Sequence, residues 1–443
     1  MLYLARLREL TARLSWDRDR ILHHQRTGLR ALLRRALASP WQCSRLGGLD
    51  PDRFELGDLG GLPTMRKSDV LERFDELVAP LPLSRRHVER HLARARPGEP
   101  LVGGYQVVTS GGTSGAQSIY VYDPGSWAEC AAGFVRSLGQ HDRPAVVAAG
   151  HGAHMSATLW KTFGGGDGLD VPVSLPLETI AEALTGFRPD LVIGFPSALA
   201  RLARRSDCRI APRTVVATSE PLDPDTARQV ERAWGCIPHD WWGCSEVGPL
   251  AASCGQGPGM HLNEDLAVVE PVDRLGHPVA EGEQAHRVLV TGLYNRVLPL
   301  IRYELDDAVV LDPHPCPCGR AYRRVARVEG RRDEVLRYGP REIHPHVLRS
   351  PLARPGVYDY QVRQTARGVS VHVTGDAGLN LQSLRCDILE ALARAGLPCP
   401  EVEVAFGEGL RLPSGKLRRF IPLPPDHYDC GAEGRFGHSS PPR

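Results

Sequence analysis

The sequence of 443 residues has little net charge, few aromatic residues (6%) and no long apolar run. The formal net charge is +2, so no strong electrostatic field marks the chain as a binder of nucleic acid or of an acidic membrane surface. No apolar run is long enough to span a bilayer. The start, MLYLARLREL, has neither the apolar core nor the small-residue cleavage site of a secretory signal. These absences predict a cytoplasmic globular protein without nucleic-acid or membrane partners.

Lysine is almost absent. Of the 54 basic residues, only Lys67, Lys161 and Lys416 are lysines, and the rest are arginine. A biased codon usage explains the preference for arginine. Because the lysine ammonium is a compact, flexible point charge that arginine does not imitate, each lysine that remains is a candidate for a specific role.

Local patterns predict an α/β fold in which a helical start precedes alternating strands and helices. Apolar residues recur at helical spacing from residue 1 to about 80. From about residue 100, short apolar runs such as AVVAAG, LVIGFP and TVVATS read as buried strands. The segment DPDTARQVERAWG follows the third run, with Asp223 at the N-cap, Pro224 in the first turn and Gly235 at the stop. This alternation predicts a largely parallel sheet.

The character of the sequence changes near Arg331. We expect a large domain over residues 1–330, a polar connection over 331–335 and a small α+β domain over 336–425. The small domain is indicated by the strand-like runs VYDYQVRQ, GVSVHVTG and EVEVAF and by one helical run between them. The last segment, 426–443, is rich in Gly, Ser and Pro, and we expect it to fray.

The stretch VVTSGGTSGAQSIYVY places a loop of hydroxyl residues and glycines between two strand-like runs. Glycines let backbone N–H groups approach an oxyanion, and Ser and Thr add hydroxyl donors, so TSGGTSG is a candidate phosphate cradle. It is neither a Walker A loop nor a dinucleotide fingerprint. The alternative is a flexible hairpin turn.

Three further motifs bear on this choice. HDWWGCSEVGP sets two tryptophans, on which a purine could stack, before Glu246, which could bind Mg²⁺ with phosphates. PLIRYELDD ends in two carboxylates suited to ribose hydroxyls, and RLPSGKLRRF carries Lys416 after a turn. Each has a plain structural alternative: a core tryptophan pair, a solvated turn and a basic turn before a last strand.

In this order, the motifs TSGGTSG, TSEPL, HDWWGCSEVG, PLIRYELDD, EGRRDEVL and LPSGK resemble the signature of the adenylate-forming (ANL) enzyme superfamily. LPTMRKSDV, VIGFPSAL, HLNEDLAVVEPVD and CPCGR point more closely to its phenylacetate–CoA ligase-like branch. The resemblance runs from about residue 55 to about 420. It implies a large N-terminal domain with mixed sheets and helices and a small, mobile C-terminal domain.

The resemblance also implies a role for individual residues. The phosphate cradle would comprise Ser110, Gly111, Gly112, Thr113, Ser114 and Gly115. The adenine side would comprise Ser219, Glu220, Pro221, Asp240, Trp242 and Gly243. Ser245 and Glu246 would face the phosphates and Mg²⁺, Asp307 and Arg331 the ribose, and Asp333 would be the hinge between the domains. Lys416, with Thr113 and Glu246, would be catalytic, contacting the α-phosphate and the acyl carboxylate.

The implied function is ATP-dependent activation of a carboxylic acid as acyl-AMP, with release of pyrophosphate, followed by transfer to coenzyme A. Alternatives remain open at this point: an amide synthetase or another ligase that passes the acid to an amine or a carrier thiol, and a non-catalytic nucleotide-binding homologue. A homodimer is also expected from the resemblance. Two departures from the usual motifs occur: Trp242 replaces a tyrosine, and LDD replaces TGD before the retained Asp307.

Cysteine usage predicts a metal site. There are 11 cysteines, an odd number without the regular spacing of a disulfide framework. CGQGPGMH and CPCG supply Cys254, His261, Cys316 and Cys318, which together make a closed Cys₃His set for a structural Zn²⁺. The alternative is three ordinary cysteines and a surface histidine.

The acid-binding pocket is the least defined part of the prediction. AAGHGAHMSATLW and GFPSAL lie where the resembled family binds its acid, which makes His151, His154 and Gly194 candidates to face the substrate. A loop histidine held by its neighbours is the alternative for each. The aromatic content of 6% does not separate an aryl from an aliphatic acid.

Overall fold

The computed structural model of this chain describes residues 2–79, 81–96, 98–109, 118–148, 153–163, 168–331, 334–343, 345–352, 354, 356–407 and 418–423. Within these ranges nothing is described for the side chains of residues 329–331, 346, 349 and 350. The chain forms two compact units: of the described residues, those up to 331 belong to the first unit, and those of 334–407 and 418–423 belong to the second.

Helices occupy most of the first 80 residues. They are α1 (Leu2–Arg13), α2 (Arg18–Ala36), α3 (Pro40–Leu46), a 3₁₀ turn (Leu56–Gly61), α4 (Lys67–Val78) and, just beyond, α5 (Arg85–Leu92). The Asp17 side chain accepts a hydrogen bond from the backbone of Arg20 and so caps α2. Ile21, Leu29 and Leu33 lie at helical spacing and are fully buried, so that one face of α2 packs against the core.

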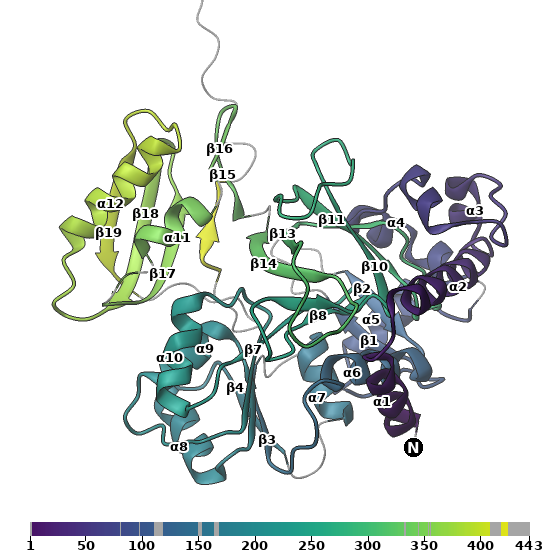
Figure 1. The fold of residues 1–443 in the computed structure, drawn as a ribbon, viewed down its shortest axis with the longest axis horizontal. Coiled ribbons are helices and arrows are strands. Elements are labelled where there is room, and N and C mark those ends of the chain that lie inside the picture. Colours follow the sequence, from purple (N-terminus) through teal and green to yellow (C-terminus); the bar gives the residue numbers. More distant parts are fainter. Residues whose placement is uncertain are drawn as a thin grey trace, which may run out of the picture. The chain divides into compact units, whose positions relative to one another are not determined.

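A nine-stranded sheet forms the centre of the first unit (Figure 1). Its order is β13 (Asp307–Asp312), β14 (Arg324–Arg331), β9 (Met260–Leu262), β8 (Gly248–Ala252), β7 (His239–Cys244), β6 (Thr214–Thr218), β5 (Leu191–Gly194), β3 (Pro144–Ala148) and β4 (Leu169–Pro172). Strands β4 to β7 pair in parallel. The pairings from β7 to β13 are antiparallel. The expectation of a largely parallel sheet is therefore wrong for this half, where no described helix lies between neighbouring strands in the sequence.

Helix α6 (Pro124–Val135) leads from the β1–β2 hairpin to β3. The parallel strands are connected by α7 (Met155–Phe163), α8 (Leu177–Phe187), α9 (Pro196–Ala203) and α10 (Pro224–Trp234). The signals read in DPDTARQVERAWG are confirmed at both ends of α10. Asp223 accepts a hydrogen bond from the backbone of Thr226, Pro224 occupies the first turn, and Gly235 ends the helix at a φ of 78°.

Two smaller sheets complete the first unit. β1 (Gln106–Thr109) and β2 (Ile119–Tyr122) form an antiparallel hairpin, and the hydroxyl- and glycine-rich loop lies between them in the sequence. β10 (Ala267–Val272), β11 (Arg287–Gly292) and β12 (Tyr303–Leu305) form a three-stranded antiparallel sheet.

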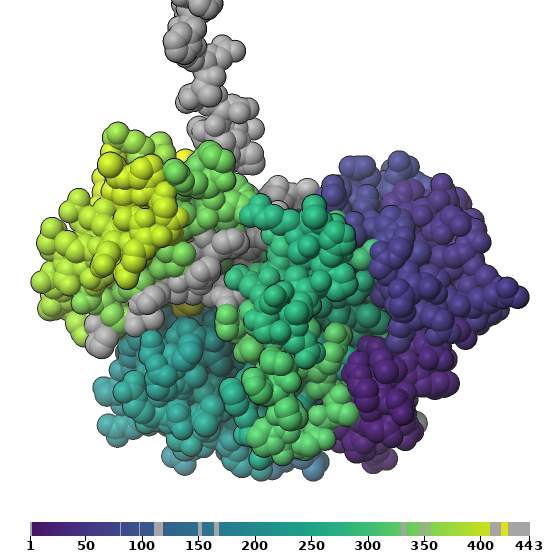
Figure 2. Space-filling model, turned by 45° about the horizontal axis from the view of Figure 1, so that its top comes forward, coloured from purple at the N-terminus to yellow at the C-terminus, as the bar shows by residue number. Residues whose placement is uncertain are grey.

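A buried ionic network fixes the N-terminal helices to this unit. Asp265, which is 1% exposed, accepts two hydrogen bonds from Arg136 of α6 at 2.7 and 2.8 Å. Glu264 is fully buried and binds Arg18 of α2 and Arg323. Figure 2 shows the N-terminal helices, in purple, against the green part of the unit. Charges buried in this way are paired, as burial requires.

The second unit is an α+β domain. A hairpin of β15 (Leu336–Tyr338) and β16 (Arg341–Ile343) precedes α11 (His346–Leu352). A sheet in the order β19 (Glu401–Phe406), β18 (Gly368–Gly375), β17 (Val357–Gln364) and β20 (Phe420–Ile421) shares its core with α12 (Leu381–Arg394). The strands expected from VYDYQVRQ, GVSVHVTG and EVEVAF are all present.

Among the described helices, none combines the length and the hydrophobicity that crossing a membrane would require.

Candidate active site

Residues expected at the adenine, at the phosphates and in the acid pocket gather at the carboxyl ends of the parallel strands. Gly194 ends β5, residues 219–221 follow β6, and Ser245 and Glu246 follow β7, and these three strands are neighbours. This edge is where α/β sheets bind ligands. Ser219 has a φ of 70°, a left-handed conformation that non-glycine residues rarely adopt outside functional turns.

Glu220 fastens the turn after β6 to the first turn of α9. Its carboxylate accepts hydrogen bonds from the backbone N–H of Ser197 at 3.0 Å and from the Ser197 hydroxyl at 3.1 Å. A carboxylate at a helix N-terminus is also stabilised by the helix dipole. The turn 219–221 is thus held rigidly beside the end of β5.

The turn that carries Ser245 and Glu246 is attached to both strands of the β1–β2 hairpin. The Ser245 hydroxyl lies 3.4 Å from the carbonyl oxygen of Thr109, the last residue of β1. The Tyr120 hydroxyl, in β2, donates to Oε1 of Glu246 at 3.1 Å. The Tyr122 hydroxyl shares its one proton between the carbonyl oxygens of Ser245 and Glu246, which lie 2.9 and 3.1 Å away. The expected cradle residues, 110–115 with Thr113 among them, lie outside the described residues, but both strands that flank them contact this turn.

The expected purine-stacking and ribose-binding residues also meet. Trp242, 7% exposed, points its indole N–H at Oδ2 of Asp307, 3.3 Å away. Asp307 and Arg331 are paired positions of β13 and β14, so the two residues expected at the ribose lie opposite each other. Gly243, next to Trp242, has no room for a side chain, because a Cβ there would lie 2.8 Å from the carbonyl oxygen of Gly248.

Asp240, the second residue of the same strand, lies in an unusual electrostatic setting. Burial raises the pKa of its carboxyl group to about 7, although a hydrogen bond from the backbone of Trp241 opposes the shift. Its backbone is clamped by Ser253, whose hydroxyl accepts from the Asp240 N–H at 3.0 Å and whose own N–H donates to the Asp240 carbonyl oxygen at 2.9 Å. The clamp fixes the strand that leads to Trp242.

Of the residues expected in the acid pocket, His154 lies next to the hairpin. It forms an isolated parallel bridge with Thr109, and the backbone of Thr109 donates to the carbonyl oxygen of Ala153 at 2.8 Å. The Nδ1 atom of His154 lies 3.0 Å from the Ser156 hydroxyl. His154 is thus near the end of β1, while His151 lies outside the described residues, as do Asp333 and Lys416.

Cys254, His261, Cys316 and Cys318 lie together, with their ligand atoms all within 4.8 Å of one another. The sulfurs of Cys254 and Cys316 are 3.5 Å apart, and the sulfur of Cys318 is 3.2 Å from Nε2 of His261. Tetrahedral Zn²⁺ with bonds of about 2.3 Å holds its sulfurs about 3.8 Å apart, so the set fits that ion. Burial lowers the pKa of His261, which favours the neutral imidazole that binds metals.

The other nitrogen of His261 has the partner that a metal-bound histidine needs. Its Nδ1 atom lies 3.3 Å from the carbonyl oxygen of Tyr322, which leaves Nε2 facing the sulfurs. The four residues come from the end of β8, from β9 and from the β13–β14 connection, which are neighbouring parts of the sheet. They therefore lie on or beside strands that also carry Asp307 and follow Glu246.

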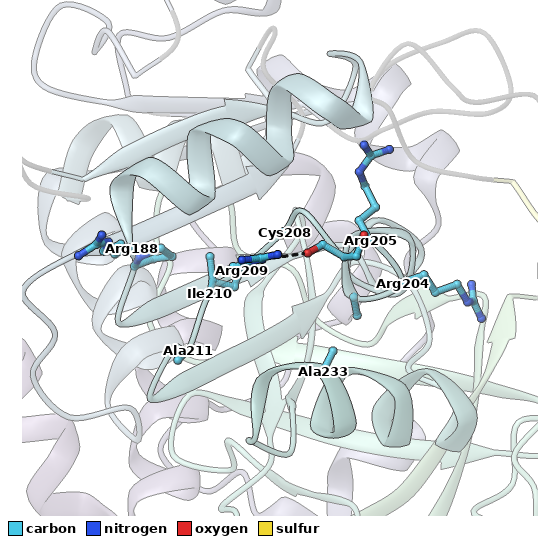
Figure 3. A pocket seen from close by; sticks show the side chains of 11 residues that line it. Arg188, Arg204, Arg205, Cys208, Arg209, Ile210, Ala211 and Ala233 are labelled. Atoms are coloured by element: carbon cyan, nitrogen blue, oxygen red, sulfur yellow. Dashed lines mark hydrogen bonds between the residues drawn. The ribbon is translucent and has the colours of Figure 1, made fainter.

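A pocket of about 720 Å³ lies at the opposite edge of the sheet, before β5 and β6 begin (Figure 3). Its lining includes Arg188, Arg204, Arg205 and Arg209, and it lies where helices α8, α9 and α10 end. Arginines at these carbonyl ends offset the helix dipoles. Figure 3 shows the guanidinium groups of Arg188, Arg204 and Arg205 pointing in different directions, so they do not converge on an anion.

Sequence reasoning missed the tyrosines that contact the Glu246 turn. The alternation in SIYVY placed Tyr120 and Tyr122 on one face of a strand, which was the available signal. Nothing in the local pattern indicated that Tyr303 of PLIRYELDD would lie 3.2 Å from the Tyr120 hydroxyl.

Comparisons with known proteins agree with the motifs. No protein-family model matches the chain. It is 28% identical to the phenylacetate-coenzyme A ligase of Thermus thermophilus over 85% of this chain and 90% of that protein. It is 26% identical to the phenylacetate-coenzyme A ligase of Aromatoleum evansii over 70% of each chain.

Among solved structures, a 2-hydroxyisobutyryl-CoA ligase in its postadenylation state superposes with a TM-score of 0.74. The two are 18% identical, and the match covers 94% of this chain and 92% of that one. The fold is therefore that of the adenylate-forming CoA ligases, and the resemblance to the phenylacetate–CoA ligase branch is confirmed.

Proposed function

We propose, from the fold shared with adenylate-forming CoA ligases and the similarity to phenylacetate–CoA ligases, that this chain is an AMP-forming acid–CoA ligase. One observation carries the proposal. The turn of Ser245 and Glu246 is bonded to both strands that flank the TSGGTSG loop, while Trp242 and Asp307 meet on adjoining parts of the same unit. These contacts bring together four separate segments of the sequence, which carry or flank the residues assigned to the phosphates, the adenine and the ribose.

In the first half-reaction a carboxylate oxygen of the acid attacks the α-phosphorus of ATP, and the bond to pyrophosphate breaks. The product is an acyl-AMP. Negative charge builds up between the carboxylate and the phosphate in the transition state, and preorganised donors stabilise it. We assign this role to the loop 110–115, including Thr113, and to Lys416. Mg²⁺, when bound beside Glu246, would neutralise phosphate charge and orient the nucleotide.

In the second half-reaction the sulfur of coenzyme A attacks the acyl carbon, and AMP leaves with the electrons of the broken carbon–oxygen bond. The acyl-AMP is the activated species, because AMP is a far better leaving group than hydroxide. We assign Asp333 as the hinge about which the small domain rotates between the two half-reactions. This rotation would move Lys416 out of the active site and let the thiol of coenzyme A reach the acyl-AMP.

Cys254, His261, Cys316 and Cys318 would hold one Zn²⁺ with no open coordination position, which makes the ion structural. Its place between the end of β8 and the β13–β14 connection supports a role in fixing the strands of the nucleotide site. His154 and Gly194 are assigned to the side of the site that receives the acid.

Acid-dependent release of pyrophosphate from MgATP tests the proposal. A panel of aryl and short aliphatic acids would be offered with coenzyme A first omitted and then added. We expect one acid class to release pyrophosphate and coenzyme A to increase turnover and yield an acyl-CoA. Release that an amine or a carrier thiol stimulates, and coenzyme A does not, would make the chain an amide synthetase or a carrier-loading ligase. Tight ATP binding with no release for any acid would mark it as a non-catalytic homologue.

A further inference from the structure

A chain of buried hydroxyl groups ends on the carboxylate of Glu246. The hydroxyl oxygens of Tyr303 and Tyr120 are 3.2 Å apart, and the Tyr120 hydroxyl lies 3.1 Å from Oε1 of Glu246. Tyr120 is fully buried and Tyr303 is 2% exposed. All three residues belong to the first unit, and the two tyrosines come from different sheets.

The direction of the hydrogen bonds follows from the groups themselves. A carboxylate only accepts, and a phenol has a single proton, so Tyr120 donates to Glu246 and receives a bond from Tyr303. Burial, with the negative charge of Glu246 nearby, raises the pKa of both phenols, so both remain protonated.

The backbone holds each tyrosine firmly. Tyr120 is paired with Val108 across the β1–β2 hairpin, and Tyr122 on the same face of β2 bonds the backbone of the Glu246 turn. The backbone on either side of Tyr303 is hydrogen-bonded to Met65. The Met65 N–H donates to the Arg302 carbonyl oxygen at 3.0 Å, and its carbonyl oxygen accepts from Glu304 at 2.8 Å. The segment LPTMR thus supports the end of the hydroxyl chain.

We propose that Tyr120, supported by Tyr303, is a positioning residue that fixes one carboxylate oxygen of Glu246 and so presents the other to the Mg²⁺ that accompanies the nucleotide. This inference rests on the proposed function. The two phenols precede the carboxylate in the hydrogen-bond chain, which ends at Glu246. Neither phenol is assigned a contact with a substrate. Their effect on the reaction passes through Glu246.

An equilibrium measurement without turnover tests this role. The affinity for ATP is measured by calorimetry in the absence of an acid, once with Mg²⁺ and once with a chelator. The ratio of the two dissociation constants is the gain that Mg²⁺ confers. We expect Tyr120→Phe to reduce this gain about tenfold, since a hydrogen bond to a charged group is lost, and to change the affinity in chelator little. Tyr303→Phe keeps the donor to Glu246, and we expect a smaller loss of about threefold.

Three controls separate positioning from damage to the fold. Tyr338→Phe removes a partly buried tyrosine hydroxyl bond in the second unit, to the carbonyl oxygen of Gly368, and should leave the gain unchanged. Glu246→Gln should lose most of the gain, and adding Tyr120→Phe to it should have no further effect. Thermal midpoints show whether each variant is folded. If Tyr120→Phe does not fold, Tyr303→Phe decides the question by itself.

The outcomes distinguish the two proposals. If a folded Tyr120→Phe variant keeps the full gain in ATP affinity from Mg²⁺, the positioning role alone is overturned. If Tyr120→Phe does not fold, an unchanged gain in Tyr303→Phe overturns it instead. An additive loss in the double variant does the same, because the tyrosine would then act independently of Glu246. A wild-type chain that binds ATP no more tightly with Mg²⁺ than without it would overturn the proposed function and this inference together.

Discussion

The indole N–H of Trp242 points at the carboxylate of Asp307 across 3.3 Å, although the two residues lie 65 positions apart in the sequence. Each residue was assigned to a different part of the nucleotide, Trp242 to the purine and Asp307 to the ribose. Their contact means that the position of the indole ring and the direction of the carboxylate are set together.

The first prediction concerns this pair. Trp242→Phe keeps an aromatic face but removes the N–H, so we expect KM for ATP to rise several-fold with a smaller change in kcat. Asp307→Ala should raise KM more, on the order of tenfold or above, because a charged hydrogen-bond acceptor is lost. Steady-state kinetics with varied ATP measures both, and equal effects on kcat alone would contradict the assignment.

The second prediction concerns Lys416. Lys416→Ala should slow acid-dependent pyrophosphate release by on the order of 10² or more, because a preorganised charge is lost from the transition state. ATP affinity should change little. Lys161→Ala is the matched control, since Lys161 pairs with Asp170 at 2.7 Å on the first unit and is assigned no part in catalysis. Equal activities of the two variants would remove Lys416 from the mechanism.

The third prediction concerns the metal. The purified protein should contain one equivalent of zinc by elemental analysis, and Cys316→Ser should lose it. We expect the variant to melt several degrees lower and to show a raised KM for ATP, because the ion ties β8, β9 and the β13–β14 connection together. Cys43→Ser is the control, since Cys43 is an exposed cysteine outside the cluster. A zinc-free wild-type protein with unchanged stability would disprove the site.

The fourth prediction follows from Asp240, whose pKa is raised to about 7. Between the ordinary carboxyl pKa and about 7 the folded state keeps a proton that the unfolded chain has released, so this group makes stability fall as pH rises through that window. Asp240→Asn should therefore melt several degrees higher than the wild type at pH 8 and show no gain at pH 4. Thermal midpoints at the two pH values measure this, and a gain of equal size at both would exclude the titration of Asp240 as its cause.

The sequence predicted those features that depend on neighbours along the chain. The cap at Asp223, the stop at Gly235 and the strands of the second unit lie where local patterns indicate. The four residues predicted to hold zinc do lie together, as expected from the few ligand types that suit that ion. Local patterns are enough in these cases because each decision involves only residues a few positions apart or a rare chemical type.

Features that depend on distant pairing were not predictable in this way. In the antiparallel half of the central sheet, the partners of the strands are set by tertiary packing. Tyr120 contacts Glu246, which lies 126 positions further along the chain, and Tyr303, which lies 183 positions further along. No local sequence signal selects these two partners. The burial of Glu264 and Asp265 could not be predicted either. Two adjacent acidic residues are expected at the surface unless the arginines that pair with them are known.

The ionic network around Asp265 has a consequence for how the chain folds. The carbonyl oxygen of Arg13 in α1 accepts a hydrogen bond from Tyr322, 309 positions later, and Arg18 in α2 pairs with Glu264. During synthesis the first helices leave the ribosome long before these partners exist. The apolar face of the amphipathic helix α2 therefore lacks its packing partners until most of the first unit has been synthesised. We expect chaperone dependence to concentrate in this interval of translation.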